Sequence, residues 1–321
     1  MNVTDIIHSA VLTGRTRFSF EVLPPLKGEG VSKLFHEIDA VMEYDPASIN
    51  VTCHRETLHE RMLPDGRVER HNARRRPGTV GISAAIQRRF SVETVPHLIC
   101  CGNSRYDIED ALIDMEFSGL HNVLALRGDK LPAEECFTPH PDGYAHAAEL
   151  VAQIAAMNRG QFIDGEPEVC SPSHFSIGVA GYPECHVEAP SDESDLHYLK
   201  AKVEAGAHYI VTQLFFDNSR FLAFRDRCVA AGIDLPIIPG IKPLSTLRHL
   251  ETLPRIFGCS IPGELEREVR RHSNDPQAVR EIGTEWAIAQ TRGLKAAGVP
   301  MVHYYTMSRT DQIRQIVRAV F

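Results

Sequence analysis

Short apolar runs alternate with longer segments of helical periodicity along almost the whole chain. The runs are rich in Val, Ile and Phe, as strands are, and the longer segments repeat apolar residues every three or four positions. The predicted strands span residues 17–22, 48–52, 95–100, 122–126, 175–180, 209–215, 236–241 and 301–306. The predicted helices span residues 31–43, 82–90, 106–117, 145–157, 196–205, 221–231 and 276–297. Strands that are apolar almost throughout need cover on both faces, so this alternation predicts a parallel sheet.

The number of strands narrows the architecture further. Eight parallel strands close a TIM barrel, so we predict an α/β fold of the (β/α)8 type. An open doubly wound sheet is the alternative, but the glycine-rich first turn common in that fold is missing. By length, 321 residues could hold two domains, yet no linker rich in Pro, Gly or Ser divides them. We therefore expect residues 1–321 to form a single barrel domain.

Charge and cysteine usage limit the classes of partner. The 34 Lys and Arg residues against 42 Asp and Glu residues give a net charge of -8, which disfavours a nucleic-acid-binding face. The eight cysteines lack zinc-ligand spacing, so we expect reduced thiols and no metal site. Neither a signal peptide nor an apolar run of about 20 residues is present. We expect no membrane contact and a cytoplasmic location.

The densest basic run, Arg74-Arg75-Arg76, lies in a long polar segment that precedes a predicted helix. Its neighbours Pro77 and Gly78 favour a loop. We interpret the run as part of a solvated loop, with contact to a ligand phosphate as the alternative.

Polar residues stand where the predicted strands end. In a barrel of this type, the active site lies at the carboxyl ends of the strands. The polar residues at those ends are Glu21, Thr52, His97, Arg127, Asp129, the run 181–186, Gln213, Lys242 and Arg309. They can meet in one site only if the barrel closes.

Glu21 is placed in an apolar setting, between Phe20 and Val22 and just before Pro24 and Pro25. Burial raises the pKa of a carboxyl group. A carboxylic acid that stays protonated near neutral pH can donate a proton to a leaving nitrogen or oxygen. The alternative is a Glu in the barrel interior that is paired with Lys or Arg.

The string ALRGD places Gly128 between Arg127 and Asp129 at a strand exit, where a ligand can approach the backbone closely. The alternative is that the two charged side chains only pair with each other. His97 and His186 are likewise either ligand contacts or structural histidines.

Gln213 is a neutral amide close to Phe215 and Phe216. This combination suits a planar heterocycle that takes hydrogen bonds from one amide and stacks on a ring. The alternative is an aromatic core that contains one satisfied Gln.

Five strings, in this order, resemble motifs of the 5,10-methylenetetrahydrofolate reductase family. They are FSFEVLPP (18–25), VPHLIC (95–100), ALRGD (125–129), YPECHVEA (182–189) and TQLFFD (212–217). The later strings PIIPGIKP and YYTMSR also fit, so the resemblance covers about residues 18–321. Five ordered motifs are far more specific than any one of them.

The resemblance implies a (β/α)8 barrel that holds FAD without a glycine-rich dinucleotide fingerprint. It implies reduction of methylenetetrahydrofolate to 5-methyltetrahydrofolate, with NADH or NADPH as hydride donor and ping-pong transfer through the flavin, in one-carbon metabolism and methionine supply. Glu21 would be the general acid that assists opening of the imidazolidine ring, Asp129 would lie between flavin and folate, and Gln213 would bind pterin or nicotinamide. Thr52 would contact the nicotinamide nucleotide and Arg309 the folate, through its glutamate tail. The implied FAD contacts are His97, Arg127, Gly128, Asp129, Tyr144, Ala145, Tyr182, His186, Asp195 and Lys202.

Some positions depart from the family pattern. The run Cys53-His54-Arg55 follows the second strand where many members have Tyr-Gly-Ala, and Tyr198 and Ala201 replace the usual Asn and Arg. Part of the diphosphate contact must then come from elsewhere, with His54 or Arg55 as substitutes. The chain ends soon after the barrel, so we expect no C-terminal regulatory domain.

The sequence leaves two alternatives to an FAD-dependent reductase. One is a flavin-free reductase of the same fold, which the altered FAD contacts favour. The other is a non-catalytic barrel subunit of a one-carbon complex, which the presence of Glu21, Asp129 and Gln213 together argues against, because binding alone needs no acid. A homo-oligomer is compatible with the sequence.

Overall fold

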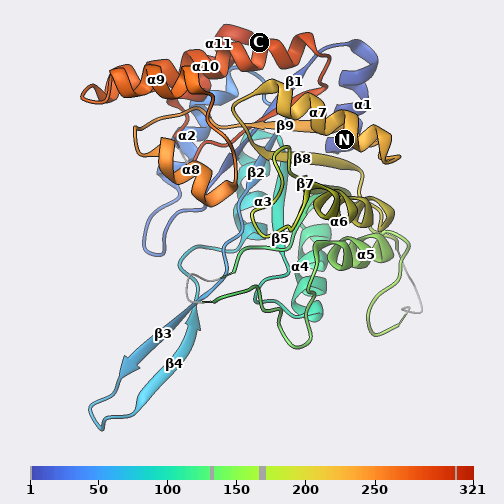
Figure 1. Cartoon of the computed structure of the whole chain (residues 1–321). Coiled ribbons are helices and arrows are strands. Elements are labelled where there is room, and N and C mark those ends of the chain that lie inside the picture. The colour runs from blue at the N-terminus through green and yellow to red at the C-terminus, as the bar shows by residue number, and fades with distance from the viewer. Residues whose placement is uncertain (1, 131–133, 166–170, 308) are drawn as a thin grey trace.

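A ring of eight parallel strands forms the centre of the computed structural model, which describes residues 2–130, 134–165, 171–307 and 309–321. The barrel strands are β1 (Arg17–Val22), β2 (Ser48–Val51), β5 (Glu93–Ile99), β6 (Asn122–Leu126), β7 (Ser176–Gly181), β8 (Tyr209–Leu214), β9 (Ile237–Ile241) and β10 (Met301–Tyr304). Their order around the ring is β1, β10, β9, β8, β7, β6, β5 and β2, and β2 pairs again with β1. Figure 1 shows the helices around this ring. The predicted closed (β/α)8 barrel is confirmed.

Helices connect successive strands as predicted, with small differences in their bounds. These helices are α2 (Ser32–Met42), α3 (Thr79–Phe90), α4 (Arg105–Phe117), α5 (Ala147–Met157), α6 (Asp192–Glu204), α7 (Asn218–Ala230) and α10 (Pro276–Ala296). Several begin before the first apolar residue of the pattern, because a polar side chain caps them. Asp217 accepts a hydrogen bond from the backbone N–H of Ser219 at 2.8 Å, and Ser191 accepts one from that of Ser194 at 3.2 Å.

The described residues also contain helices that the periodicity does not predict: α1 (Val3–Thr13), α8 (His249–Phe257), α9 (Gly263–Arg271) and α11 (Asp311–Val320). Three of them, α8, α9 and α11, lie on the same side of the barrel in Figure 1. Within the described ranges, no helix combines the length and the apolar character that a membrane crossing requires.

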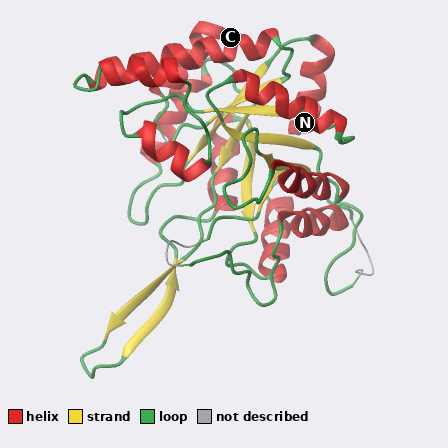
Figure 2. Cartoon of the chain, in the orientation of Figure 1, coloured by secondary structure: helices red, strands yellow, loops and turns green. Residues whose placement is uncertain are grey.

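The long polar segment before α3 is not a simple loop, so that prediction was wrong. Its residues form an antiparallel hairpin of β3 (Thr57–Met62) and β4 (Val68–Ala73), which projects from the barrel in Figure 2. The hairpin is exposed on both faces and therefore lacks the apolar alternation that marks a half-buried strand. Polar cross-strand pairs hold it instead, such as Glu60 with Arg70 at 2.8 Å.

The basic run after β4 is a loop, as expected, but part of it is held in place. Arg74 and Arg75 are exposed, and Arg74 pairs with Glu56 at 2.9 Å. The guanidinium of Arg76 donates a hydrogen bond to the backbone carbonyl of Pro24, which ties this loop to the segment after β1.

The barrel interior changes in character along its axis. Its amino-terminal end is an apolar cluster that α1 closes with Val3 and Ile7; the strands contribute Val95, Leu124, Tyr209, Val211, Ile238 and Met301. The backbone N–H of Val3 also donates to the side-chain oxygen of Asn122 at 2.7 Å. The opposite end carries polar side chains and an open cavity. Because one end is filled, a ligand can enter only at the carboxyl ends of the strands.

Candidate active site

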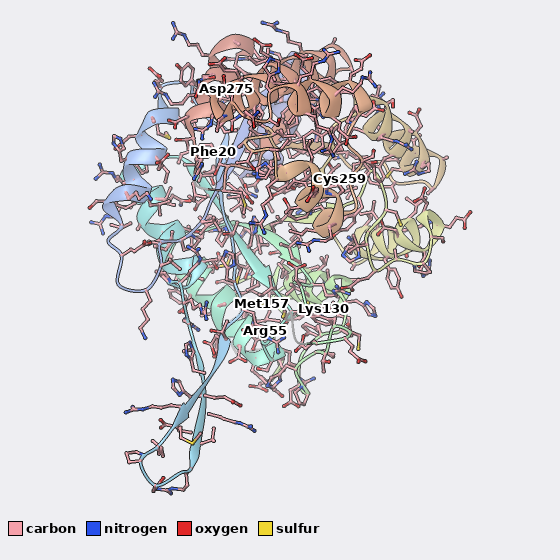
Figure 3. All side chains as sticks on the ribbon, turned by 60° about the vertical axis from the view of Figure 1, so that its left-hand side comes forward. Phe20, Arg55, Lys130, Met157, Cys259 and Asp275 are labelled. Carbon is pink, nitrogen blue, oxygen red and sulfur yellow. The ribbon has the colours of Figure 1, made fainter. Side chains whose placement is uncertain are left out.

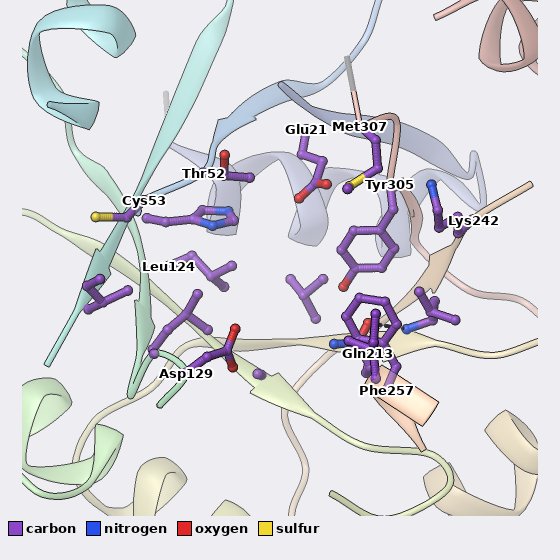
Figure 4. A pocket seen from close by; sticks show the side chains of 18 of the residues that line it. Glu21, Thr52, Cys53, Leu124, Asp129, Gln213, Lys242, Phe257, Tyr305 and Met307 are labelled. Atoms are coloured by element: carbon purple, nitrogen blue, oxygen red, sulfur yellow. Dashed lines mark hydrogen bonds between the residues drawn. The ribbon is translucent and has the colours of Figure 1, made fainter. Parts of the chain in front are cut away.

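A cavity of about 910 Å³ lies at the carboxyl ends of the barrel strands, and Figure 4 shows it from close by. This volume is near the upper end of the range for ligand sites. Most of the predicted site residues line it: Glu21, Thr52, His97, Arg127, Gly128, Asp129, Tyr182, His186, Lys202, Gln213 and Arg309. The closed barrel therefore brings together residues that are up to 288 positions apart in the chain, from Glu21 to Arg309.

Glu21 is buried on the wall of this cavity and is only 6% exposed. Burial raises the pKa of its carboxyl from 4.5 to about 7, although the positive charge of Lys242 acts in the opposite direction. No ion pair in direct contact joins Glu21 to Lys or Arg in the described part of the chain, so the alternative of a paired interior Glu is limited to the longer-range charge of Lys242. An acid with this pKa is half protonated near neutral pH and can give a proton to a substrate.

The barrel interior near Glu21 contains two buried histidines that stay neutral. The Nδ1 of His303 lies 2.9 Å from the hydroxyl of Ser19, and the Nε2 of His97 lies 3.3 Å from the side-chain nitrogen of Asn50. Burial lowers the pKa of each imidazole from 6.5 to about 3. The sequence leaves His97 as either a ligand contact or a structural histidine. It lines the cavity and also forms part of the polar interior, so it fits both.

Gln213 lies on β8, where a β-bulge between Val211 and Leu214 interrupts the pairing with β9. Bulges often re-aim side chains beside active sites. The side-chain oxygen of Gln213 accepts a hydrogen bond from the backbone N–H of Leu214 at 2.8 Å, while its amide nitrogen donates to none of the described residues. The amide is thus half-buried at the cavity wall and able to bind a ligand.

The expected stacking partners of Gln213 lie elsewhere. Phe215 and Phe216 are buried in the core and do not line the cavity, and the ring of Phe215 stacks on that of Phe221 at 5.5 Å. The aromatic residues that do line this part of the cavity are Phe257 and Tyr305. The prediction that Phe215 and Phe216 present rings to a ligand was therefore wrong, because the strand ends at Leu214 and the chain turns into the core.

Arg127 and Asp129 both line the cavity but do not pair with each other. The guanidinium of Arg127 contacts the carboxylate of Glu188 at 2.6 Å and lies 4.7 Å from the ring centre of Phe137. Asp129 is exposed to the cavity. Between them Gly128 has a φ of +85°, and a Cβ there would lie 2.7 Å from the Cβ of Cys101. Only glycine fits this turn without strain.

Lys202 and Asp195 both lie on α6. Lys202 is buried, and burial lowers the pKa of its ammonium to about 8. Its ammonium donates to the backbone carbonyl of Ala180. Asp195 does not line the cavity; its carboxylate accepts a hydrogen bond from the backbone N–H of His186 at 3.2 Å and so holds that loop in place. Tyr182 packs edge-on against His186, with ring centres 4.7 Å apart.

Tyr144 and Ala145 precede α5 and do not line the cavity. Tyr144 packs against the hydrophobic core, and the backbone N–H of Ala145 donates to the Glu149 carboxylate at 3.0 Å. Ala147, the first residue of α5, lines the cavity instead.

Several lining residues carried no sequence signal, or only part of one. Lys242 was expected at a strand end without a role, and His249 and Phe257 come from α8, which the periodicity does not predict. Tyr305 follows β10 and donates its hydroxyl proton to the backbone carbonyl of Thr212 at 2.7 Å. The one available signal for Tyr305 was its position directly after a strand, and His249 and Phe257 carried no such signal.

The residues present fit an extended anionic cofactor such as FAD. The cavity of about 910 Å³ is lined by residues from β1 to α6, and the buried ammonium of Lys202 has no carboxylate within ion-pair distance among the described residues. Arg55 lines the cavity as well, although it is held by Glu134 at 3.0 Å. Lys130 donates to the backbone carbonyl of the same Glu134, and Figure 3 shows both basic residues on one side of the barrel.

The departures on α6 remain visible in the structure. Tyr198 is exposed and stacks on His146, with ring centres 5.2 Å apart, so it contributes nothing to the cavity wall. Ala201 is absent from the wall too. Lys202 is thus the one residue of α6 that lines the cavity.

Comparisons with known proteins show the family to which the chain belongs. The family described as methylenetetrahydrofolate reductase matches residues 6–320. A 5,10-methylenetetrahydrofolate reductase of Pectobacterium carotovorum is 33% identical over 302 residues, which cover 94% of this chain and 89% of the relative. The Salmonella typhimurium protein of the same name is 32% identical, with 94% and 90% covered.

Two further comparisons extend this result. Methylenetetrahydrofolate reductase (NADH) 1 of Arabidopsis thaliana is 34% identical over 317 residues, and the chain spans about half the length of that relative, 49%. A solved structure of an uncharacterized Clostridium thermocellum protein that binds 5-methyl-5,6,7,8-tetrahydrofolic acid superposes with a TM-score of 0.58 at 12% identity, covering 98% of this chain and 97% of that chain, which shows a shared fold. With the family match over residues 6–320 and two bacterial relatives covered almost end to end, the chain belongs to the methylenetetrahydrofolate reductase family.

Proposed function

We propose that this protein reduces 5,10-methylenetetrahydrofolate to 5-methyltetrahydrofolate, with FAD as cofactor and NADH or NADPH as hydride donor. The observation that carries the proposal is the meeting of a buried acid, Glu21, with Asp129 and Gln213 around one cavity at the carboxyl ends of the strands. Family membership supports the same chemistry.

The two half-reactions use the cavity in turn. The nicotinamide nucleotide binds first, against Thr52 and Gln213, and leaves after hydride transfer; the folate then occupies the same space. FAD, when bound, supplies the redox chemistry by accepting the hydride and passing it to the folate. Gln213 serves both heterocycles because each presents amide-like edges to a single side-chain amide.

Glu21 acts in the folate half-reaction only. Its carboxyl gives a proton to the departing ring nitrogen of the imidazolidine, and the carbon–nitrogen bond that opens leaves an iminium cation on the substrate. Asp129, exposed to the cavity, places a negative charge close to that cation. Arg309 binds the acidic glutamate tail at the cavity rim.

The residues proposed to hold FAD come from neighbouring strand ends. Arg127, Gly128, Tyr182, His186 and Lys202 line the cavity directly. Asp195 acts behind that wall, by holding the loop that carries His186. Tyr144 and Ala145 precede α5, whose first residue, Ala147, lines the cavity. The phosphates would take the place of Glu188 on Arg127.

The first prediction concerns the absorption spectrum. The purified protein should be yellow, and its flavin absorption should bleach anaerobically on addition of NADH or NADPH and return with methylenetetrahydrofolate. The nucleotide that bleaches it faster identifies the preferred donor. A colourless protein that reduces the folate without added FAD would instead establish the flavin-free reductase, and a yellow protein inert to both substrates would favour the non-catalytic subunit.

A further inference from the structure

Lys242 is a buried cation on the cavity wall, without an ion-pair partner among the described residues. It follows β9, is 7% exposed, and lines the same cavity as Glu21 and Tyr305, which Figure 4 labels with it. No hydrogen bond or ion pair joins its ammonium to another residue in the part of the chain that the structure describes. A buried ammonium loses its hydration, so it is normally retained only where a negative charge compensates it.

Glu21 is the carboxylate whose charge reaches Lys242. The charge of Lys242 lowers the pKa of Glu21, and the charge of Glu21 raises the pKa of Lys242, so each group favours the charged form of the other. The other titratable neighbours of Lys242 carry no negative charge. Arg309 is positively charged, and burial, together with the charges of Lys242 and Arg309, lowers the pKa of His249 to about 4. Lys242 therefore has one anionic neighbour to stabilise.

The remaining titratable groups near Glu21 stay uncharged at neutral pH. Tyr305, after β10, has its pKa raised well above the usual range by burial and by Glu21. His303 on β10 and His97 on β5 are neutral. None of these groups can compensate a negative charge on Glu21.

We propose that Lys242 is a positioning residue for the reaction: its ammonium stabilises the carboxylate that remains on Glu21 after proton donation. This inference rests on the proposed function. In the step concerned, the proton moves from the Glu21 carboxyl to the ring nitrogen, the carbon–nitrogen bond breaks, and its electron pair stays on that nitrogen. Lys242 keeps its own proton throughout. Without it, the new carboxylate would stand in a desolvated cavity without a counter-charge.

The test separates the charge of Lys242 from its ability to donate a proton. Lys242→Met removes the charge and keeps most of the side-chain length, whereas Lys242→Arg keeps the charge but cannot release a proton near neutral pH. Lys33→Met removes an exposed lysine of α2 and is the matched control. Circular dichroism verifies that each variant is folded.

The primary measurement is an infrared titration of the Glu21 carboxyl in the folate-free protein, with the band assigned by its loss in Glu21→Gln. We expect the titration midpoint to rise by about one pH unit in Lys242→Met, since an opposite charge at close range lowers a carboxyl pKa by that order. Lys242→Arg and Lys33→Met should keep the wild-type midpoint. An unchanged midpoint in Lys242→Met would refute the proposal.

The second measurement is the pH profile of the folate half-reaction. Its alkaline limb should move with the infrared midpoint in Lys242→Met and stay in place in Lys242→Arg, while flavin reduction by the nicotinamide changes in neither variant. Loss of the folate half-reaction in Lys242→Arg would identify Lys242 as a proton donor and overturn the counter-charge role. If the infrared midpoint shifts as expected but no variant, nor the wild type, reduces the folate, the pairing stands and the proposed function fails.

Discussion

Glu21 is an acid because of where its side chain points. Phe20 and Val22 point outward into the core between strands and helices, whereas Glu21 points into the barrel, level with Asn50 of β2. The hydroxyl of Thr306 donates to the backbone carbonyl of Glu21 at 2.6 Å and fixes this strand end. The backbone is thus held, and burial of the carboxyl keeps its pKa high and its proton available.

The second prediction is that Glu21→Gln separates the half-reactions. Flavin reduction by the nicotinamide moves no proton through a carboxyl, so it should survive within a small factor. Folate reduction should fall by about 10²- to 10⁴-fold, because Gln preserves shape but cannot supply the proton. Stopped-flow measurement of each half-reaction makes the comparison, and equal losses in both would exclude Glu21 as the general acid.

At the scale of elements, β3 and β4 form a unit that the barrel does not need. The hairpin projects from the fold, and Met62 near its turn is 72% exposed. Its two ends meet at the paired residues Thr57 and Ala73. The barrel strands on either side, β2 and β5, pair directly with each other.

The third prediction is that replacing residues 58–72 with Asn-Gly leaves the barrel folded. Two residues can connect paired antiparallel positions in a tight turn. The melting temperature should change by no more than about 2 °C, as for other surface changes of about 0.5 kcal/mol. Calorimetry would measure it, and loss of the cooperative transition would show that the hairpin stabilises the barrel.

Gly128→Ala is the control that shows whether calorimetry can detect a small loss of stability in this protein. The new Cβ would meet the Cβ of Cys101 at 2.7 Å, on a backbone with a φ of +85°. Strain of this kind costs about 1–3 kcal/mol. This one methyl group should therefore lower the melting temperature more than removal of the whole hairpin end.

At the scale of the whole molecule, the polar barrel interior makes stability depend on pH. His97 and His303 keep pKa values of about 3 in the folded state, against 6.5 when exposed. Below pH 6.5 the unfolded state therefore binds more protons at these two histidines than the folded state does. Their contribution to stability is present above pH 6.5 and is lost on acidification towards pH 3. Glu21 acts in the opposite sense, because its folded pKa of about 7 exceeds its ordinary 4.5.

The fourth prediction follows from these signs. As the pH falls from 7 to 5, each of the two buried histidines should lower the free energy of unfolding by about 2 kcal/mol. Proton uptake by Glu21 should raise it by about the same amount, which offsets the effect of one histidine. Urea midpoints should therefore fall as the pH is lowered, and they should fall more steeply in Glu21→Gln. A shallower dependence in that variant than in the wild type would contradict the assignment of the raised pKa to Glu21.

The sequence by itself determined the eight strands, most of the helices and the strand-end positions of Glu21, Gln213 and Asp129, because periodicity and cap residues are local properties. It missed the exposed hairpin and α8, whose apolar patterns are weak or short. Only the tertiary structure decided which charged groups share a site: Arg127 is held by Glu188, and Lys242 lines the same cavity as Glu21, 221 positions away in the sequence. Charge pairing and burial depend on closure of the barrel, and no local pattern in the chain encodes the distance between two strand ends.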